Sequence, residues 1–284
     1  MKSLIVIQGC GRGIGRALLK GLAKNIDPSK SHILALNRSK PTDLDSNRNS
    51  TEFDPNSTTF FPLDIAKLSQ QTGSLTDSGS EVAAISAWLS ANQKELGIRQ
   101  IWNVAGVLHP ERSILNTFVD PAAWQQASNS FHTNVLGPLR LFSLLVPQMW
   151  RQPAGSNPSS SLLPLPLGIF NLSARVSSIE ENSTLGGWHS YRASKTAANQ
   201  IMRNLHLELS RKSNRQDPVP CLSLHPGFVD TDMTRPFHRN MKPGQVWSPD
   251  QAAAKLLSMS SSAEAMQRLS GKLYDIQKDE IIPF

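Results

Sequence analysis

Two side chains of this sequence, Tyr191 and Lys195, have the types and the spacing of an acid–base pair. They are four residues apart, so in a helix they lie on one face, one turn apart. Residues 191–209 carry apolar side chains at three- and four-residue intervals and contain no Pro or Gly, which predicts such a helix. An ammonium beside a phenol favours the phenolate, so we expect the pKa of Tyr191 to fall from about 10 towards neutrality. Such a tyrosine could give or take a proton at neutral pH, although two ordinary surface residues of a helix would show the same spacing.

A glycine-rich loop near the start of the chain predicts a nucleotide site. The apolar run 4–8 predicts a strand, Gly9, Gly13 and Gly15 follow it, and helix-period apolar residues resume at Ile14. Strand, glycine turn and helix in this order are typical of a dinucleotide-binding loop. The missing side chains let the backbone approach a pyrophosphate, and the start of the helix supplies amide donors.

Two arginines indicate which dinucleotide this site would take. After the second strand, an acidic residue binds the ribose hydroxyl of NAD, whereas an arginine accommodates the 2′-phosphate of NADP. Here Arg38 follows the expected strand 31–36, and no Asp or Glu occurs between Asp27 and Asp43. With Arg12 inside the glycine loop, this pattern predicts NADP(H), although either arginine alone could simply be exposed.

Strand-like and helix-like segments alternate from one end of the chain to the other. This alternation predicts an α/β fold with a mostly parallel sheet flanked by helices, a single doubly wound Rossmann-type domain over residues 1–284. We expect exposed insertions near 39–59 and 151–166 and a lid over 234–247. The expected strands are 4–8, 31–36, 60–64, 98–106, 167–174, 220–225 and 272–276, and the expected helices start near Ile14, 81, 124, 191 and 249, the third being interrupted at Gly137-Pro138.

Composition limits the class of protein and its partners. The 284 residues are 39% hydrophobic and 18% charged, and no window of 18 consecutive apolar residues predicts a transmembrane helix. The first apolar run leads into the glycine loop, so we interpret it as a strand and not a signal peptide. Cys10 and Cys221 have no metal-site spacing and fit a reducing compartment, hence a cytoplasmic location. The net charge is +7, but its Lys and Arg residues are scattered, so neither nucleic acid nor a membrane is an expected partner.

Four motifs in this order resemble the short-chain dehydrogenase/reductase family over nearly the whole chain. The glycine loop resembles its Gly-x-x-x-Gly-x-Gly, residues 103–106 resemble Asn-Asn-Ala-Gly with Val104 in place of the second Asn, and Tyr191 with Lys195 resembles its catalytic pair. The fourth motif, residues 226–231, is similar to its Pro-Gly turn with a following Thr. Residues 172–195 look most similar to the C-factor and sniffer-like carbonyl reductase branch.

The resemblance implies an NADPH-dependent reduction of an aldehyde or ketone to an alcohol, or the reverse, by a homodimer or homotetramer without a metal. Tyr191 would be the acid/base, Lys195 would tune it and hold the nicotinamide ribose, and Asn134 would hold a water to the lysine. Asp64 would contact the adenine. The residues implied to bind the cofactor are Gly9, Arg12, Gly13, Ile14, Gly15, Asn37, Arg38, Asp64, Ile65, Asn103, Ala105, Gly106, Tyr191, Lys195, Pro226, Gly227, Val229 and Thr231.

One departure concerns the catalytic serine. The family commonly has Ser-Ser at the end of the fifth strand and uses the second serine, whereas this chain has Ser173-Ala174. A shift of one residue turns a side chain to the opposite face of a strand, so Ser173 would reach the site only through a bulge. Counting back from Tyr191 leads to Ser178, which adjoins Ser177. We predict Ser173 before Ser178, the alternative being that none of these serines reaches the substrate. The Ser173-Ala174 departure also favours a second function, that of an NADP(H)-binding regulatory or signalling protein with little activity.

Overall fold

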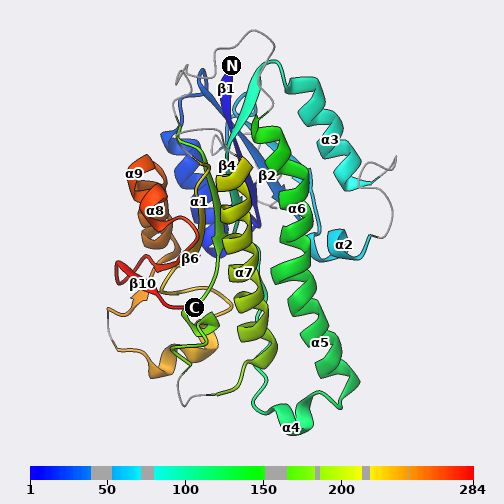
Figure 1. The fold of residues 1–284 in the computed structure, drawn as a ribbon, viewed down its shortest axis with the longest axis vertical. Helices are drawn as coiled ribbons and strands as arrows, with labels where there is room; N and C mark the ends of the chain where they lie inside the picture. Colours follow the sequence, from blue (N-terminus) through cyan, green and yellow to red (C-terminus); the bar gives the residue numbers. More distant parts are fainter. Residues whose placement is uncertain (40–52, 72–79, 151–164, 183–185, 213–217, 243) are drawn as a thin grey trace.

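The computed structural model describes residues 1–39, 53–71, 80–150, 165–182, 186–212, 218–242 and 244–284. Its central sheet has eight strands in the order β10-β9-β6-β5-β4-β1-β2-β3 (Figure 1). Adjacent strands of this sheet run parallel, except for the antiparallel pair β9–β10. The expected mostly parallel, doubly wound sheet is therefore confirmed. The strands are β1 (Lys2–Gln8), β2 (Ser31–Asn37), β3 (Thr58–Pro62), β4 (Leu96–Asn103), β5 (Gly168–Leu172), β6 (Cys221–His225), β9 (Leu273–Asp275) and β10 (Glu280–Ile282).

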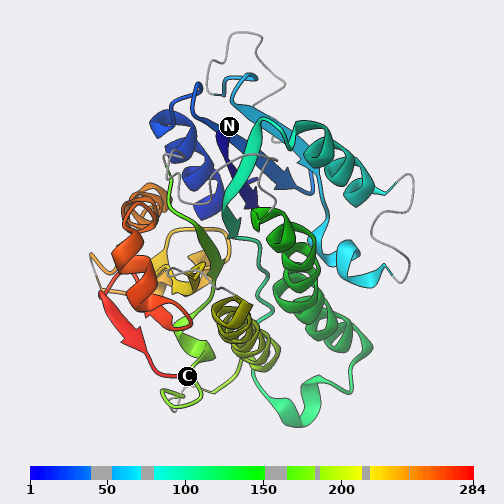
Figure 2. The same ribbon diagram turned by 45° about the horizontal axis from the view of Figure 1, so that its top comes forward.

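Helices cover both faces of this sheet. On one face lie α1 (Gly13–Asn25), α8 (Pro249–Ser260) and α9 (Ala263–Leu269), and Figure 2 shows them grouped on the side opposite α3 and α6. The other face carries α2 (Ile65–Gln70), α3 (Glu81–Asn92), α5 (Pro121–Phe131), α6 (Gly137–Leu145) and α7 (His189–Lys212), with the short α4 (Ile114–Thr117) at its far end.

The central strand β1 shows why the sheet needs helices on both sides. Successive side chains of a strand point to opposite faces. Leu4 and Val6 pack in a core with α3, α6 and α7, whereas Ile5 and Ile7 pack in a second core with α1 and α8. All four side chains are buried. A strand buried on both faces reads as an unbroken apolar run, which is the pattern that predicted it.

The helical region 121–150 differs from the expectation of an interruption at Gly137-Pro138. Between α5 and α6 lies a π-helical turn, η2 (His132–Leu136), in which Gly137 N–H donates to the His132 carbonyl, and a 3₁₀ turn, η3 (Val146–Trp150), follows α6. Pro138 lies in the first turn of α6, where a missing N–H costs little, so the helix continues. Gly137 is needed because a β-carbon there would overlap the Ile65 carbonyl oxygen.

Other differences lie at the ends of elements. β3 begins two residues before the expected strand, and α9 and β10 were not expected. In the segment 234–247, expected to be a lid, a 3₁₀ helix η5 (Arg235–Asn240) precedes β8 (Val246–Trp247), which pairs with β7 (Phe228–Val229). The two expected insertions lie largely outside the described residues. Among the described helices, none is both long and apolar enough to cross a membrane.

Candidate active site

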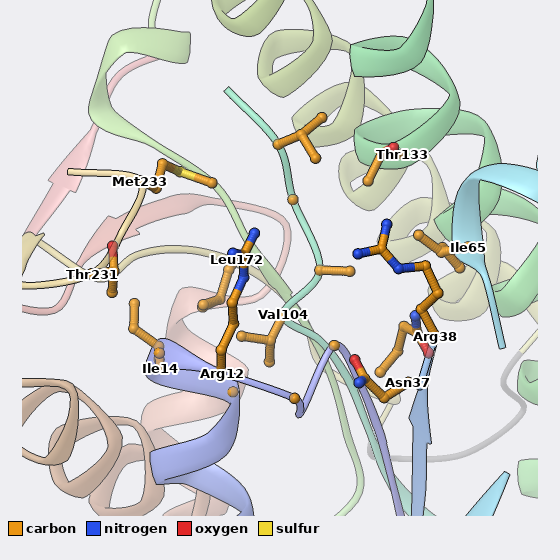
Figure 3. A pocket seen from close by; sticks show the side chains of 18 of the residues that line it. Arg12, Ile14, Asn37, Arg38, Ile65, Val104, Thr133, Leu172, Thr231 and Met233 are labelled. Carbon is orange, nitrogen blue, oxygen red and sulfur yellow. The ribbon is translucent and has the colours of Figure 1, made fainter. Parts of the chain in front are cut away.

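A cleft of about 480 Å³ opens along the carboxyl ends of the parallel strands. It begins at β1 and β4, the point where the strand order reverses, and open α/β sheets bind their ligands at such a point. Its walls come from the loops after β1, β2, β3, β4, β5 and β6, together with α5, η2 and α7. Figure 3 shows this cleft with Arg12 and Ile14 on one side and Asn37, Arg38 and Ile65 on the other.

The glycine loop closes one end of the cleft through tight backbone contacts. Gly9 has φ +88°, and a β-carbon on it would lie 2.5 Å from the Ala105 nitrogen. A β-carbon on Gly15 would overlap the Gly9 carbonyl oxygen. At the N-terminus of α1, the Arg12 side chain makes no capping hydrogen bond. The first turn of α1 therefore offers backbone amides to the cleft, which suits an anion such as a pyrophosphate.

Arg12 and Arg38 are both exposed and extend into this cleft (Figure 3). The Arg12 guanidinium lies 3.6 Å from the Asp232 carboxylate, both side chains being largely exposed. Arg38 makes no ion pair with the described residues, and it stands directly after β2. A cation beside the end of β2 lies where an NADP 2′-phosphate is bound in dinucleotide folds.

The helix α7 carries Tyr191 and Lys195 into the cleft, and both side chains are buried. Lys195 Nζ donates to the Leu172 carbonyl over 2.8 Å and lies 6.0 Å from the centre of the Tyr191 ring. Burial lowers the pKa of Lys195 to about 8 and raises the pKa of Tyr191 to about 12. The expectation that the Tyr191 pKa falls is therefore wrong for this structure, because burial disfavours the charged phenolate.

Asn134 lies in the π-helical turn, behind the cleft wall. Its Oδ1 accepts from Val107 N–H at 2.9 Å, and its Nδ2 donates to Val107 O and to Ser194 Oγ, each at 3.0 Å. A β-carbon on Gly106 would lie 3.2 Å from Lys195 Nζ and 3.4 Å from Asn134 Oδ1, so the lysine and the asparagine approach the same point. A π turn inside a helix frequently marks a functional site. That Asn134 holds a water for Lys195 stays a prediction.

The three candidate serines have different surroundings. Ser173 lines the cleft with Tyr191, and its Oγ lies 3.4 Å from Ser177 Oγ. Ser177 Oγ accepts from Asn199 Nδ2 at 2.7 Å and donates to the Ala174 carbonyl, while Ser178 Oγ accepts from Glu181 N–H at 3.0 Å.

The strand β5 keeps a regular register with both of its neighbours. The backbone of Ala174 remains extended, with φ −148° and ψ 146°. The expected bulge is therefore wrong: Ser173 lies one residue beyond β5 and reaches the cleft without one.

Most residues expected to bind the cofactor meet in this cleft, and three do not line it. Asn103 donates to Asn171 Oδ1 at 2.7 Å inside the sheet, Gly227 packs against Gln277, and Val229 is buried in β7. Asp64 lines the cleft while its Oδ1 caps α2 by accepting from Ala66 N–H at 3.0 Å. The expected residues that line it are Gly9, Arg12, Gly13, Ile14, Gly15, Asn37, Arg38, Asp64, Ile65, Ala105, Gly106, Ser173, Tyr191, Lys195, Pro226 and Thr231.

Several lining residues were missed by the sequence analysis. Most are neighbours of expected residues, and the spacing of four between Asn129 and Thr133 was the one further signal, since it places them on one helix face. The missed residues are Gln8, Gly11, Ser39, Leu63, Ala66, Val104, Val107, Asn129, Thr133, Leu172, Asp232 and Met233.

Comparison with protein families identifies a match to the short chain dehydrogenase model over residues 174–242. Among curated proteins, 1-hydroxy-2-glutathionyl-2-methyl-3-butene dehydrogenase of Rhodococcus sp. (strain AD45) is 32% identical over 197 residues, which is 69% of this chain and 73% of that protein. C-signal of Myxococcus xanthus is 33% identical over 109 residues, 38% of this chain and 55% of that protein.

Solved structures match the whole fold. The carbonyl reductase Sniffer of D. melanogaster and the NADPH-bound carbonyl reductase from chicken fatty liver each have a TM-score of 0.73, with 20% identity and 100% of both chains covered. At this identity the likeness establishes the fold.

Proposed function

The chain belongs to the short-chain dehydrogenase/reductase family, with likeness to its C-factor and sniffer-like branch, and on this premise we propose that it is an NADPH-dependent oxidoreductase that converts a carbonyl group to an alcohol or catalyses the reverse. The observation that carries the proposal is that Tyr191, Lys195 and Ser173 line the same cleft as the glycine loop and Arg38. The phenol, the ammonium and the hydroxyl of these three residues thus lie in one cleft with the dinucleotide-binding loop.

The described cleft fits NADP(H). Glycines at 9 and 15 leave room that β-carbons would fill, the first turn of α1 presents amide donors, and Arg38 supplies a cation without an acidic partner among the described residues. The NADPH-bound structure among the matches supports the same cofactor. When bound, NADPH supplies a hydride to the carbonyl carbon. Arg38 and Arg12 would hold its 2′-phosphate, and Lys195 its nicotinamide ribose.

In this proposal Tyr191 is the acid of the reduction. Burial raises the pKa of Tyr191 to about 12, so its Oη carries a proton at neutral pH. An alkoxide is far more basic than a phenolate, so transfer of the Oη proton to the developing alkoxide remains downhill. Ser173 Oγ would donate a hydrogen bond to the carbonyl oxygen and orient it. The Lys195 ammonium would stabilise the phenolate that the transfer leaves behind and return a proton to it.

The experiment compares the wild-type protein with Tyr191→Phe. NADPH consumption is followed with a panel of aldehydes, ketones and quinones, and NADPH binding is measured separately by fluorescence. We expect turnover of at least one carbonyl by the wild type, its loss in the variant, and NADPH binding by both. Equal rates in the two proteins would refute the role of Tyr191.

A regulatory protein that binds NADP(H) and does little chemistry is the second candidate. Two observations favour it: Ala174 stands where the family commonly has its catalytic serine, and one curated relative is named C-signal. NADPH binding without turnover above the Tyr191→Phe background would support this function over the first.

We also propose that the single domain works as a homodimer or homotetramer on a small-molecule substrate. Trp124 of α5, Leu136 of η2 and Leu139 of α6 are 64%, 41% and 43% exposed, and this helical region lies on the same face of the sheet as α7. Apolar side chains gathered in this way are typical of a subunit interface. Light scattering of the purified chain would test this, and a monomer at micromolar concentration would exclude it.

A further inference from the structure

Glu111 is a buried acid that the proposed chemistry does not use. It lies in the segment after β4, is 7% exposed, and contacts the residues with which α7 begins. From these contacts we propose that Glu111 is a positioning residue: it holds Trp188 and Ser190, and through them it fixes the phenol of Tyr191 in the cleft. The inference rests on the proposed role of Tyr191.

Two separate groups of Glu111 hold the start of α7. Its backbone carbonyl accepts from Trp188 N–H at 2.7 Å, and its carboxylate Oε1 accepts the Ser190 hydroxyl. These partners lie three residues and one residue before Tyr191. A β-carbon on Gly187 would lie 2.9 Å from the same Glu111 carbonyl, so the close approach of the two segments requires a glycine there. Glu111 thereby holds one residue just before the first residue of α7, Trp188, and one residue just after it, Ser190.

Trp188 extends this contact to the ring of Tyr191. Its φ is +54°, a left-handed conformation that a bulky residue adopts only when its surroundings impose it. In that conformation its ring lies 6.4 Å from the Tyr191 ring, edge to face, and 4.8 Å from the Phe237 ring of η5. The hydrogen bond from Trp188 N–H to Glu111 is one of the contacts that hold this conformation. A displacement of the backbone at residue 111 would therefore reach the Tyr191 ring through Trp188, and the Glu111 side chain, through Ser190, helps to hold that backbone against α7.

Stability alone does not account for a carboxylate at this place. Glu111 Oε2 is buried and has no hydrogen-bond partner among the described residues. A buried acceptor without a partner costs free energy, and an apolar side chain would fill the space without that cost. A carboxylate gives the Ser190 hydroxyl a stronger acceptor, and its negative charge is favourable beside the N-terminus of a helix as long as α7. Such a cost is typical of functional sites.

The activity test uses Glu111→Ala, Glu111→Gln and a control. Glu111→Ala removes the carboxylate that accepts from Ser190 and keeps the backbone carbonyl that accepts from Trp188 N–H. We expect kcat to fall about tenfold to a hundredfold, the effect of a small displacement of a reacting group, with the NADPH Kd unchanged. Glu111→Gln keeps a weaker acceptor for Ser190, so its kcat should lie between those of Glu111→Ala and the wild type. Ser262→Ala, which removes the cap of α9 far from the cleft, should lower Tm and leave kcat unchanged. Loss of Tm without loss of kcat in Glu111→Ala would refute the positioning role.

Ser190→Ala serves as the second variant if Glu111→Ala does not fold. Because the two residues share one hydrogen bond, we expect Ser190→Ala to lower kcat by itself, and to lower it also in the Glu111→Gln background, which keeps an acceptor for Ser190. Full activity of Ser190→Ala would overturn the side-chain half of the proposal.

A second readout needs no activity and so separates this inference from the proposed function. The chain has only two tyrosines, Tyr191 and Tyr274, so Tyr274→Phe protein labelled with fluorotyrosine reports Tyr191 alone by ¹⁹F NMR. We expect Glu111→Ala to shift or split this resonance, and Glu111→Gln and Ser262→Ala to leave it near its place. An unchanged resonance in Glu111→Ala would contradict the inference even if the enzyme is active. A shifted resonance in a protein without turnover would uphold it while the proposed function fails.

Discussion

The Lys195 ammonium lies 6.0 Å from the centre of the Tyr191 ring and donates to the Leu172 carbonyl at the end of β5. This hydrogen bond ties the helix that carries both residues to the carboxyl end of an inner strand of the sheet. Burial moves their pKa values apart: it raises the pKa of Tyr191 from 10.0 to about 12, against expectation, and lowers the pKa of Lys195 from 10.5 to about 8. At neutral pH the pair is therefore a neutral phenol beside an ammonium, which is the protonation state that a reduction needs.

Lys195→Met removes the ammonium and its bond to Leu172. We expect most of the reductase activity to be lost and NADPH binding to weaken, because one change removes both the charge beside Tyr191 and the proposed ribose contact. Initial rates and NADPH titrations check this. Lys212→Met is the matched control, since this lysine stands at the exposed end of the same helix and pairs with Glu208. Near-normal turnover in Lys195→Met would be incompatible with the proposed pair.

The pH dependence of the reduction follows from the two pKa values. Because the pKa of Lys195 is lowered to about 8, its ammonium is present below that pH and is lost as the pH rises through it. Tyr191 keeps its proton to about 12. The value of kcat/KM reports the ionisation of the free enzyme. We therefore expect kcat/KM for carbonyl reduction to fall as the pH rises above about 8, and to stay low between about pH 8 and 10. A profile that is flat through this range would show that Lys195 supplies no proton.

Arg38→Asp places a carboxylate where the NADP 2′-phosphate would lie. A charge-assisted hydrogen bond contributes roughly 1.5–3 kcal/mol, so NADPH affinity should fall at least about tenfold while NADH becomes the better cofactor. Kd values for both cofactors measure the change. Lys94→Asp makes the same charge change at an exposed position after α3 and should leave both Kd values unaltered. If Arg38→Asp behaved like this control, Arg12 would be the arginine that selects the cofactor.

Ser173→Ala tests which hydroxyl meets the carbonyl. We expect kcat to fall about 10²-fold, as on loss of one oxyanion donor, with NADPH binding intact. Ser178→Ala should be nearly silent, because its hydroxyl is held by Glu181 N–H. If both variants stay active, Tyr191 alone holds the carbonyl, and Ala174→Ser should then raise the rate. If Ser178→Ala abolished activity and Ser173→Ala did not, Ser178 and not Ser173 would be the serine that binds the carbonyl.

The sequence predicted the fold well where the pattern is local. Apolar runs such as 4–8 and the helix of Tyr191 have periods that can be read directly, and their order predicts a doubly wound sheet. Pro138 misled the prediction because its effect depends on its place in a helix turn, and sequence does not reveal that place. β10 was missed because it is three residues long and is defined by its pairing with β9.

For the site, too, the sequence predicted the features that depend on local patterns and missed those that depend on distant contacts. The glycines and the Tyr191–Lys195 spacing are local, and the structure gathers them in one cleft. The direction of the Tyr191 pKa was not predictable, because it depends on burial by residues far along the chain. The same holds for Asn103, which bonds to Asn171 on the neighbouring strand instead of lining the cleft, and for Glu111, 79 residues away from its partner Ser190.

The most direct test of the proposed chemistry follows one hydride. The wild-type protein is given NADPH deuterated on one face of the nicotinamide C4 and a carbonyl that it turns over, and the alcohol is analysed by mass spectrometry and NMR. We predict one deuterium on the carbinol carbon from one of the two deuterated forms only, and no labelled alcohol with Tyr191→Phe. An alcohol without deuterium from either form, or equal labelling by Tyr191→Phe, would contradict hydride transfer assisted by Tyr191.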